Sequence, residues 1–272
     1  MIGFVGTGNM GGAILRGVLA AGVLAPDEVI FTRTNAQMGQ AQAHETGARF
    51  VASAREVYEG ADIVILAVKP HAVAKVLSEL GKPKGKVIVS VAAGLNLATL
   101  AAHAPAGSPI VRVMPNVNSQ IGAGMSALCA NDAVTEEQLA AVEQVFAAVG
   151  LTARIAEKDF AAFSAIAGCS PAWTYTYIDA LARGALAAGM RLDEARRIAA
   201  QAVLGSAQLV LDQLGRHTPS DLRDQVTSPG GTTIAGLIAM EASGFTPAVI
   251  DAVNAAIARD AELGQASSVK PA

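Results

Sequence analysis

The segment Met1-Ile2-Gly3-Phe4-Val5-Gly6-Thr7-Gly8-Asn9-Met10-Gly11-Gly12 decides the fold of this 272-residue chain. The apolar residues before its second glycine predict a buried strand, and the run from Ala13 to Ala21 predicts a helix. Between them lies G-x-G-x-x-G, in the strand–loop–helix context that a dinucleotide-binding fingerprint requires. Gly6 permits the tight turn, Gly8 lets the backbone approach a pyrophosphate, and Gly11 lets the helix pack on the strand. The opening of the chain therefore predicts a dinucleotide-binding domain.

Apolar runs alternate with helical segments as far as residue 156. The predicted strands are residues 1–5, Val29–Phe31, Ala48–Val51, Asp62–Val68, Val87–Val91, Ile110–Met114, Gly122–Cys129 and Leu151–Ile155. Helical segments are predicted at Arg55–Glu59 and Asn96–Ala102, and Thr135 is predicted to cap a helix that runs to Ala148. This alternation is typical of an α/β fold, and it predicts a Rossmann-like doubly wound sheet over residues 1–156.

From Glu157 onward no strand is expected, and residues 157–272 are predicted to form an all-helical domain. The predicted helices are Asp159 to about Ala188, which Pro171 should kink or restart, one capped by Asp193 that runs to about Leu214, and Pro247 to about Leu263. Ala, Leu, Ile and Val occupy more than one face of these helices. Such surfaces favour packing between subunits, so we expect at least a homodimer through this C-terminal domain.

The second predicted strand ends at Thr32-Arg33-Thr34, the region that reads the adenosine ribose in such folds. An enzyme that uses NAD usually has Asp or Glu there, whereas Arg33 can pair with a 2′-phosphate. Arg33 therefore favours NADP over NAD, the alternative being a solvated surface arginine. Lys69 follows another buried strand and is placed to approach the cofactor, while Pro70 and His71 are interpreted as helix-start residues.

The segment Ser228-Pro229-Gly230-Gly231-Thr232-Thr233 precedes an apolar run, Ile234–Ala242, that predicts a helix. Hydroxyl groups and two glycines at a helix start suit a small anion such as a carboxylate, although an ordinary helix cap is the alternative. The candidate site segments contain no His–Asp pair, no metal-ligand cluster and no nucleophile–base arrangement. An imine that arrives protonated needs less acid–base help than an alcohol, so these segments favour a cyclic imino acid as substrate.

Composition excludes several other classes. Hydrophobic residues make up 52% and charged residues 16%, so the chain can bury a core and is not expected to be disordered. A net charge of −3 argues against a nucleic-acid or anionic-membrane binder, and no apolar run is long enough to span a bilayer. No signal peptide is expected after Met1, and Cys129 and Cys169 are expected to be reduced thiols. These features favour a cytoplasmic protein.

At this level of detail the chain resembles pyrroline-5-carboxylate reductase over essentially its whole length. The matching segments are GFVGTGNMGGAI (3–14), ILAVKP (65–70), SVAAG (90–94), RVMPN (112–116) and DQVTSPGGTTIAGL (224–237). The resemblance implies reduction of 1-pyrroline-5-carboxylate to L-proline by NAD(P)H, the last step of proline synthesis. It also implies a Rossmann domain followed by helices that interlock in a dimer, often with dimers gathered into larger rings.

Carried over to this sequence, the resemblance implies specific roles. The residues of the loop that would hold the pyrophosphate are Gly6, Thr7, Gly8, Asn9, Met10 and Gly11. Those that would meet the ribose or its phosphate are Thr32, Arg33 and Thr34, and those that would line the dinucleotide and nicotinamide are Ala67, Val68, Lys69, Pro70, Val91, Ala92 and Ala93. The substrate carboxylate would be held by Ser228, Gly230, Gly231 and Thr232. The Thr233 hydroxyl would bond near the ring nitrogen, so this site works by positioning and not by proton transfer.

One segment departs from the family. Gly168-Cys169-Ser170-Pro171-Ala172-Trp173 stands where the family usually has Gly-Ser-Gly-Pro-Ala-Tyr, near the nicotinamide and substrate. This leaves open a related imine reductase that acts on a different ring. A β-hydroxyacid dehydrogenase is a less favoured alternative. Those enzymes carry a catalytic lysine early in the helical domain, and residues 160–191 of this chain contain no lysine. A non-catalytic NADPH-binding regulator is the third alternative, against which the intact SPGGTT segment argues.

Overall fold

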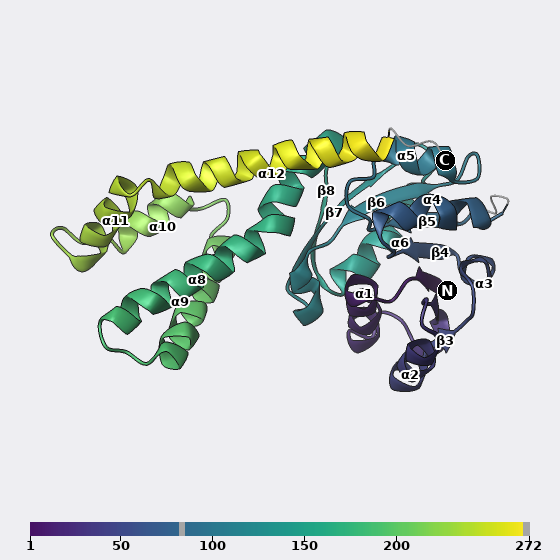
Figure 1. Ribbon diagram of the computed structural model, residues 1–272, viewed down its shortest axis with the longest axis horizontal. Helices are drawn as coiled ribbons and strands as arrows, with labels where there is room; N and C mark the ends of the chain where they lie inside the picture. The colour runs from purple at the N-terminus through teal and green to yellow at the C-terminus, as the bar shows by residue number, and fades with distance from the viewer. Residues whose placement is uncertain (82–84, 269–272) are drawn as a thin grey trace. The chain divides into compact units, whose positions relative to one another are not determined.

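The computed structural model describes residues 1–81 and 85–268 (Figure 1). Its first part is built on an eight-stranded sheet in the order β3-β2-β1-β4-β5-β6-β7-β8. The strands are β1 Ile2–Val5, β2 Val29–Thr32, β3 Arg49–Phe50, β4 Ile63–Leu66, β5 Val87–Ser90, β6 Ile110–Met114, β7 Gly124–Ala130 and β8 Gly150–Arg154. Neighbouring strands are parallel, apart from β6 and β7, which pair antiparallel. The predicted α/β class and its Rossmann-like sheet are confirmed.

Strand β1 lies at the centre of this sheet and positions the site. Phe4 is paired with Phe31 of β2 on one side and with Ile65 of β4 on the other. All four residues of β1 are buried, as expected for a short parallel strand that is covered on both faces. Because β2 and β4 flank β1, the direction of winding reverses here, and ligands of such sheets bind beyond the carboxyl ends of the strands at this point.

Helices cover both faces of the sheet. They are α1 Asn9–Ala20, α2 Ala36–Thr46, α3 Ala54–Gly60, α4 Pro70–Glu79, α5 Leu97–His103, α6 Glu136–Ala147 and α7 Phe160–Phe163, with 3₁₀ turns η1 Pro26–Glu28, η2 Val117–Ile121 and η3 Glu157–Asp159. On one face Leu15 of α1 and Phe146 of α6 pack with Phe4 in a fully buried core. On the other face Val57 of α3 and Leu77 of α4 belong to a second core. Burying these side chains contributes most of the favourable free energy of folding.

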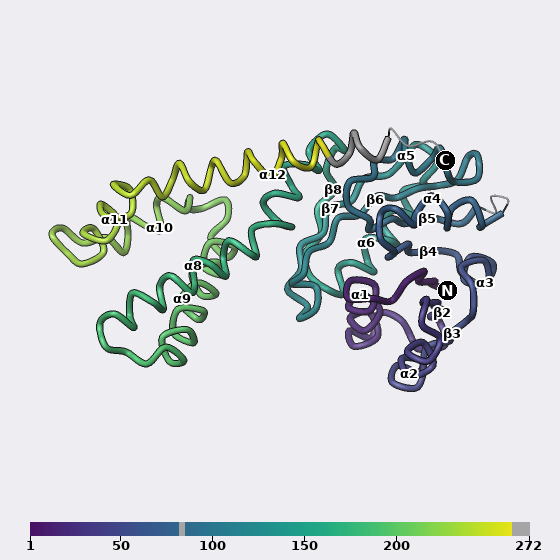
Figure 2. Tube along the Cα trace, in the orientation of Figure 1, coloured from purple at the N-terminus to yellow at the C-terminus, as the bar shows by residue number. Residues whose placement is uncertain are grey.

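Among the described residues after Arg154, helices are the only regular structure, as predicted. They are α8 Ser170–Ala187, α9 Leu192–Asp212, α10 Pro219–Gln225, α11 Thr232–Ala242 and α12 Phe245–Ser268. Helices α8 and α9 run side by side as a hairpin, which can be followed in Figure 2. Their turn contains Gly189, whose φ of +96° suits glycine.

The helix termini test the predicted caps. Thr135 caps α6 as predicted, and its hydroxyl accepts a hydrogen bond from the backbone amide of Gln138. The prediction that Asp193 caps the next helix was wrong: α9 begins at Leu192 with Arg191 as its N-cap, so Asp193 lies in the first turn. There its carboxylate accepts hydrogen bonds from the Arg191 guanidinium. An acidic residue in the first turn still favours the helix, because it faces the positive end of the dipole.

Two other helix boundaries also differ in detail. The last helix begins at Phe245, two residues before the predicted Pro247, which is accommodated because the first turn of a helix needs no proline N–H. The helix was predicted to kink or restart at Pro171, and it restarts: a short π-helix, η4, occupies Ser164–Cys169, and α8 begins after it with Pro171 in its first turn.

The described chain divides into two compact units, Met1–Gly168 with Ala256–Ser268, and Cys169–Ala255. The boundary predicted between residues 156 and 157 stays a prediction; it falls just after the last residue of β8, Arg154. Within the described residues no single helix has the length and apolarity to span a bilayer, although α11 and α12, bent by 51°, reach that composition together.

Candidate functional site

The glycines of the fingerprint loop have three different surroundings. Gly6 has a φ of +91°, and a Cβ there would meet the backbone of Ala67 at 2.8 Å. A Cβ on Gly11 would collide with the Gly6 carbonyl oxygen. A Cβ on Gly8 would meet nothing within 4 Å. Gly6 and Gly11 therefore let the loop pack on the sheet, while Gly8 leaves room beside the loop for a ligand.

The N-terminus of α1 opens toward this space. Gly8 is its N-cap, no side chain caps it, and its first turn contains no acidic residue. The first backbone N–H groups of a helix lack internal partners and carry the positive end of the dipole. These groups suit the phosphates of a dinucleotide, so the loop and helix fit the cofactor that the motif implies.

A cavity of about 790 Å³ lies over the carboxyl ends of the central strands. It is lined by Gly6, Thr7, Gly8, Asn9, Met10, Arg33, Thr34, Asn35, Ala67, Val68, Lys69, Pro70, His71, Ala72, Val91, Ala92 and Ala93. The structure thus brings together the predicted cofactor residues from four loops, apart from Gly11 and Thr32. Gly11 lies beneath the loop, and Thr32 is buried at the end of β2, where its carbonyl accepts the Gly6 N–H at 2.9 Å.

Three cavity residues were not predicted for the site. Asn35 is the N-cap of α2, and His71 and Ala72 belong to the first turn of α4. His71 is a helix-start residue, as predicted, and it also faces the cavity. Only their position in the sequence could have indicated that these residues line the cavity, because each follows a strand that ends at the same sheet edge.

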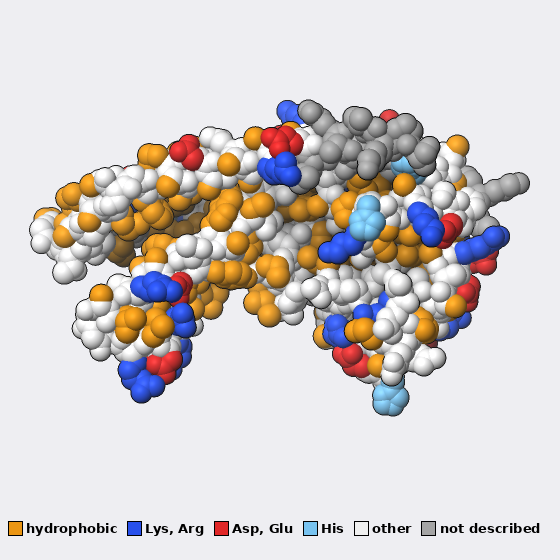
Figure 3. Space-filling model, in the orientation of Figure 1, with side chains coloured by type: hydrophobic (Ala, Val, Ile, Leu, Met, Phe, Trp, Pro, Cys, Tyr) orange, Lys and Arg blue, Asp and Glu red, His pale blue; other side chains and the backbone are white. Residues whose placement is uncertain are grey.

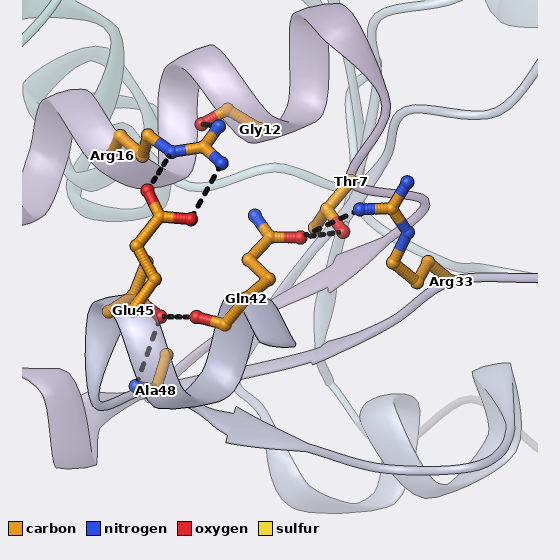
Figure 4. Close-up of polar contacts among 8 residues, drawn as sticks. Thr7, Gly12, Arg16, Arg33, Gln42, Glu45 and Ala48 are labelled. Atoms are coloured by element: carbon orange, nitrogen blue, oxygen red, sulfur yellow. Dashed lines mark hydrogen bonds and ion pairs between the residues drawn. The ribbon is translucent and has the colours of Figure 1, made fainter. Parts of the chain in front are cut away.

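Arg33 lines this cavity and a second one of about 740 Å³ beside it. Its guanidinium Nη1 donates to the Gln42 side-chain oxygen at 3.3 Å, and Nη2 lies 3.6 Å from the Met38 sulfur. Figure 4 shows Arg33 and Thr7 converging on Gln42, which comes from α2. Gln42 was not predicted as part of the site, since nothing in the sequence indicated that this helical glutamine is buried.

The Asn116 of the RVMPN segment has a structural role in the first unit. It is 7% exposed, donates through Nδ2 to the Ala167 carbonyl at 3.0 Å, and accepts the Met125 N–H at 3.2 Å. It thereby ties the end of β6 to β7 and to the π-helix η4. In this way the backbone just before the altered segment that begins at Gly168 is held in place.

The predicted substrate residues lie together in the second unit. Thr232 and Thr233 begin α11, and Gly231 is its N-cap, with no side-chain cap and no acidic residue in the first turn. Gly230 has a φ of +69°, and a Cβ on Gly231 would collide with the Ser228 hydroxyl. Gly230 therefore needs the backbone freedom of glycine, whereas a side chain at Gly231 would require the Ser228 hydroxyl to move. The segment leaves the first amides of α11 open to an anion.

Among the described residues, no group of three or more His, Cys, Asp or Glu side chains could hold a metal ion. The hydroxyls and amides of the two segments can hold and orient anionic ligands. Neither segment presents a nucleophile–base pair among the described side chains. These hydroxyls and amides suit a reaction in which the protein holds two ligands in position and one ligand transfers a group to the other.

Two family models match the chain. Residues 1–94 match the family described as NADP oxidoreductase coenzyme F420-dependent, and residues 157–263 match pyrroline-5-carboxylate reductase dimerisation. The chain is 39% identical to pyrroline-5-carboxylate reductase of Arabidopsis thaliana over 267 residues, which covers 97% of this chain and 95% of that one.

Solved structures agree over the same length. The chain is similar to pyrroline-5-carboxylate reductase of Coxiella burnetii, with a TM-score of 0.91, 31% identity and 96% and 97% of the two chains covered. It is also similar to the pyrroline carboxylate reductase of Plasmodium falciparum with NADP bound, with a TM-score of 0.85, 29% identity and 97% of each chain covered. From its sequence segments, its fold and these relatives, the chain belongs to the pyrroline-5-carboxylate reductase family.

Proposed function

We propose that this protein is an oxidoreductase that reduces 1-pyrroline-5-carboxylate to L-proline with a hydride from NAD(P)H, and that NADPH is the preferred donor. The observation that carries the proposal is the cavity over the central strands, lined by residues of the four loops that the family motifs predict. Family membership over nearly the whole chain supports the same reaction.

The proposed cofactor site follows from the charges and spaces of the cavity. The pyrophosphate binds at the uncapped N-terminus of α1, beside the open space at Gly8. Arg33 binds the 2′-phosphate, and Val91–Ala93 line the nicotinamide end. NADP is bound in the Plasmodium falciparum relative, which supports this cofactor class. The preference for NADPH is proposed from Arg33, because a guanidinium recognises a phosphate better than a neutral hydroxyl.

The proposed substrate site is the start of α11. Ser228, Gly230, Gly231 and Thr232 hold the carboxylate, and the exposed amides and hydroxyls there supply hydrogen-bond donors. The Thr233 hydroxyl bonds near the ring nitrogen and turns the imine carbon toward the hydride. In this position the negative charge of the carboxylate faces the positive end of the α11 helix dipole.

When bound, NADPH supplies the hydride, which adds to the imine carbon while the π electrons of the C=N bond move to the nitrogen. The nitrogen carries one proton that it brings from solution, so the product is the cyclic amine and NADP⁺. The residues of this chain therefore hold the cofactor and the substrate in the orientation that hydride transfer needs. This lowers the entropic part of the activation free energy. No described residue of the proposed set has to move a proton.

We further propose that the protein works as a homo-oligomer, at least a dimer, through its C-terminal helices. The dimerisation family matched by residues 157–263 supports self-association. Large apolar side chains are exposed on the helices of the second unit, among them Leu204 at 61% and Ile238 at 63%, and Figure 3 shows hydrophobic side chains gathered over these helices. Burial of such side chains against a second copy would remove them from water. A cytoplasmic location, expected from the free thiols Cys129 and Cys169, completes the proposal.

The direct test of the reaction is isotope transfer. Purified protein is incubated with pyrroline-5-carboxylate and NADPH carrying deuterium at the transferable C4 position. We expect L-proline with one deuterium on the ring carbon that was the imine carbon. Proline without deuterium, or no proline while the cofactor is bound, would contradict the proposed hydride transfer.

A further inference from the structure

Gln42 of α2 is a buried polar side chain beside the proposed cofactor site. It is 3% exposed, although its helix lies at the surface and most of its neighbours in sequence are solvated. Removing an amide from water is unfavourable unless it forms hydrogen bonds, and an apolar side chain of similar size would pack at least as well. The position therefore requires an explanation in terms of what the amide contacts.

The Gln42 side-chain oxygen accepts two hydrogen bonds from two different parts of the site. The Thr7 hydroxyl of the fingerprint loop donates at 2.7 Å, and Arg33 Nη1 donates at 3.3 Å (Figure 4). A carbonyl oxygen has two lone pairs, so it can serve both donors. Gln42 thus joins the loop proposed to hold the pyrophosphate to the arginine proposed to read the ribose.

The other end of the amide shows which of its two atoms matters. Gln42 Nε2 is buried without a hydrogen-bond partner among the described residues, and it lies 3.7 Å from where a Cβ on Gly12 would stand. Turning the amide over would let Nε2 donate to Thr7, but it would direct an N–H at the Arg33 guanidinium, which can only donate. The chain leaves a donor unsatisfied and keeps an acceptor toward Arg33.

A neighbouring arginine provides the contrast. Arg16 of α1 forms a two-pronged pair with Glu45, at 2.6 and 3.0 Å, so its charge is matched within the protein. The partners of Arg33 in the described structure are the neutral Gln42 oxygen and Met38 sulfur, so its positive charge is retained. A neutral acceptor orients the guanidinium without cancelling the charge that a phosphate would bind.

We propose that Gln42 is a positioning residue for cofactor selectivity: it fixes Arg33 for the 2′-phosphate of NADPH while preserving the charge of Arg33. This inference rests on the proposed function, because it takes the cavity to be an NADP(H) site. Gln42 would act through Arg33 and would leave the rest of the cofactor, which NADH shares, unaffected.

The test is the ratio of the NADH and NADPH dissociation constants, measured by direct titration without substrate. Gln42→Glu keeps the shape of the side chain and both acceptor contacts, but its carboxylate forms an ion pair with Arg33. NADPH should therefore bind at least tenfold more weakly, and the dissociation constant of NADH should change less than threefold. Gln42→Met removes the acceptor and should weaken NADPH three- to tenfold. Gln40→Glu adds the same charge at an exposed position of α2 and should change the ratio less than twofold.

A double variant separates positioning from folding. In an Arg33→Ala background, Gln42→Met should have no further effect on NADPH, because the residue through which it acts is gone. Equal weakening of both cofactors, an unchanged ratio, or additive effects in the double variant would overturn the inference. If the parent protein binds NADPH well and only the ratio fails to move, the proposed function stands; if the parent binds neither cofactor, both fail.

Discussion

Gly11 lies directly under Gly6, so close that a Cβ on Gly11 would collide with the Gly6 carbonyl oxygen, while Gly8 between them faces open space. Two substitutions of the same size should therefore have opposite consequences. Gly11→Ala should lower the free energy of unfolding by about 1–3 kcal/mol, the usual effect of overpacking. Gly8→Ala should leave stability nearly unchanged but weaken NADPH about tenfold or more, about 1.4 kcal/mol, because its methyl group enters the cavity. Thermal melting and cofactor titration of both variants check this; full NADPH affinity in Gly8→Ala would exclude the loop from the cofactor site.

Arg33 is the residue from which we propose the preference for NADPH. Arg33→Asp replaces a charge-assisted contact, which is worth about 1.5–3 kcal/mol, by a repelling carboxylate. NADPH affinity should fall about 10- to 100-fold, which is 1.4 kcal/mol for each factor of ten, with a much smaller effect on NADH. Titration of each cofactor measures this directly, and equal losses for both would mean that Arg33 does not contact the phosphate.

Thr233 has the proposed role of orienting the substrate ring. Thr233→Ala removes one hydroxyl, worth about 0.5–1.5 kcal/mol if the bond is made in the transition state, so kcat should fall about two- to tenfold. NADPH binding should not change, since Thr233 is not among the residues that line the cofactor cavity. Thr233→Ser keeps the hydroxyl and serves as the control. Steady-state rates that are identical for parent and Thr233→Ala would remove Thr233 from the site.

The exposed apolar side chains of α9 and α11 are expected to lie in the subunit interface. Leu204→Glu or Ile238→Glu would bury a charge there, which is strongly unfavourable without a partner. Light scattering at micromolar protein should then show smaller species than the parent, with NADPH binding retained by the sheet unit. Leu151→Glu, at an equally exposed position on β8, is the control and should keep the parent's assembly. Parent-like assembly in both helix variants would argue against this interface.

The Cys129 thiol should be poorly reactive at neutral pH. Burial raises the pKa of Cys129 to about 11, the Glu157 carboxylate adds to the rise, and Arg112 opposes it. The thiolate is the reactive form, so alkylation of Cys129 should accelerate about tenfold for each pH unit, without levelling off, from pH 7.5 to 9.5. A Cys169→Ser variant leaves Cys129 as the only thiol for iodoacetamide. A rate that already bends away from this slope near pH 9 would show an ordinary thiol, whose pKa is about 8.5.

The sequence predicted the sheet well because its strands carry a strong signal. Runs such as Ile63–Leu66 are apolar on both faces, and several are followed by glycine or alanine, as β1 is by Gly6 and β4 by Ala67. Helices with weak apolar periodicity were harder. The short helix Pro219–Gln225 was not expected, although Thr218 and Asp221 form a capping box that signals its start.

The cofactor loops could be predicted because their chemistry is local to each segment. The contacts of Gln42 could not be predicted. Gln42 is 35 positions from Thr7 and 9 positions from Arg33, and its contacts with them depend on which face of α2 is buried. Helical periodicity does not place a glutamine inward, because burial of an amide is unfavourable until a specific partner is known. Such interior polar contacts emerge only from the packed structure.

The most direct test of the central claim is NADPH oxidation, followed by absorbance, on addition of pyrroline-5-carboxylate to the purified protein. Parallel reactions use NADH as the donor and the six-membered homologue piperideine carboxylate as the acceptor. The account predicts fastest oxidation with NADPH and the five-membered ring. No oxidation with pyrroline-5-carboxylate while NADPH is bound would contradict it, and faster turnover of the six-membered ring would favour the related imine reductase that acts on a different ring.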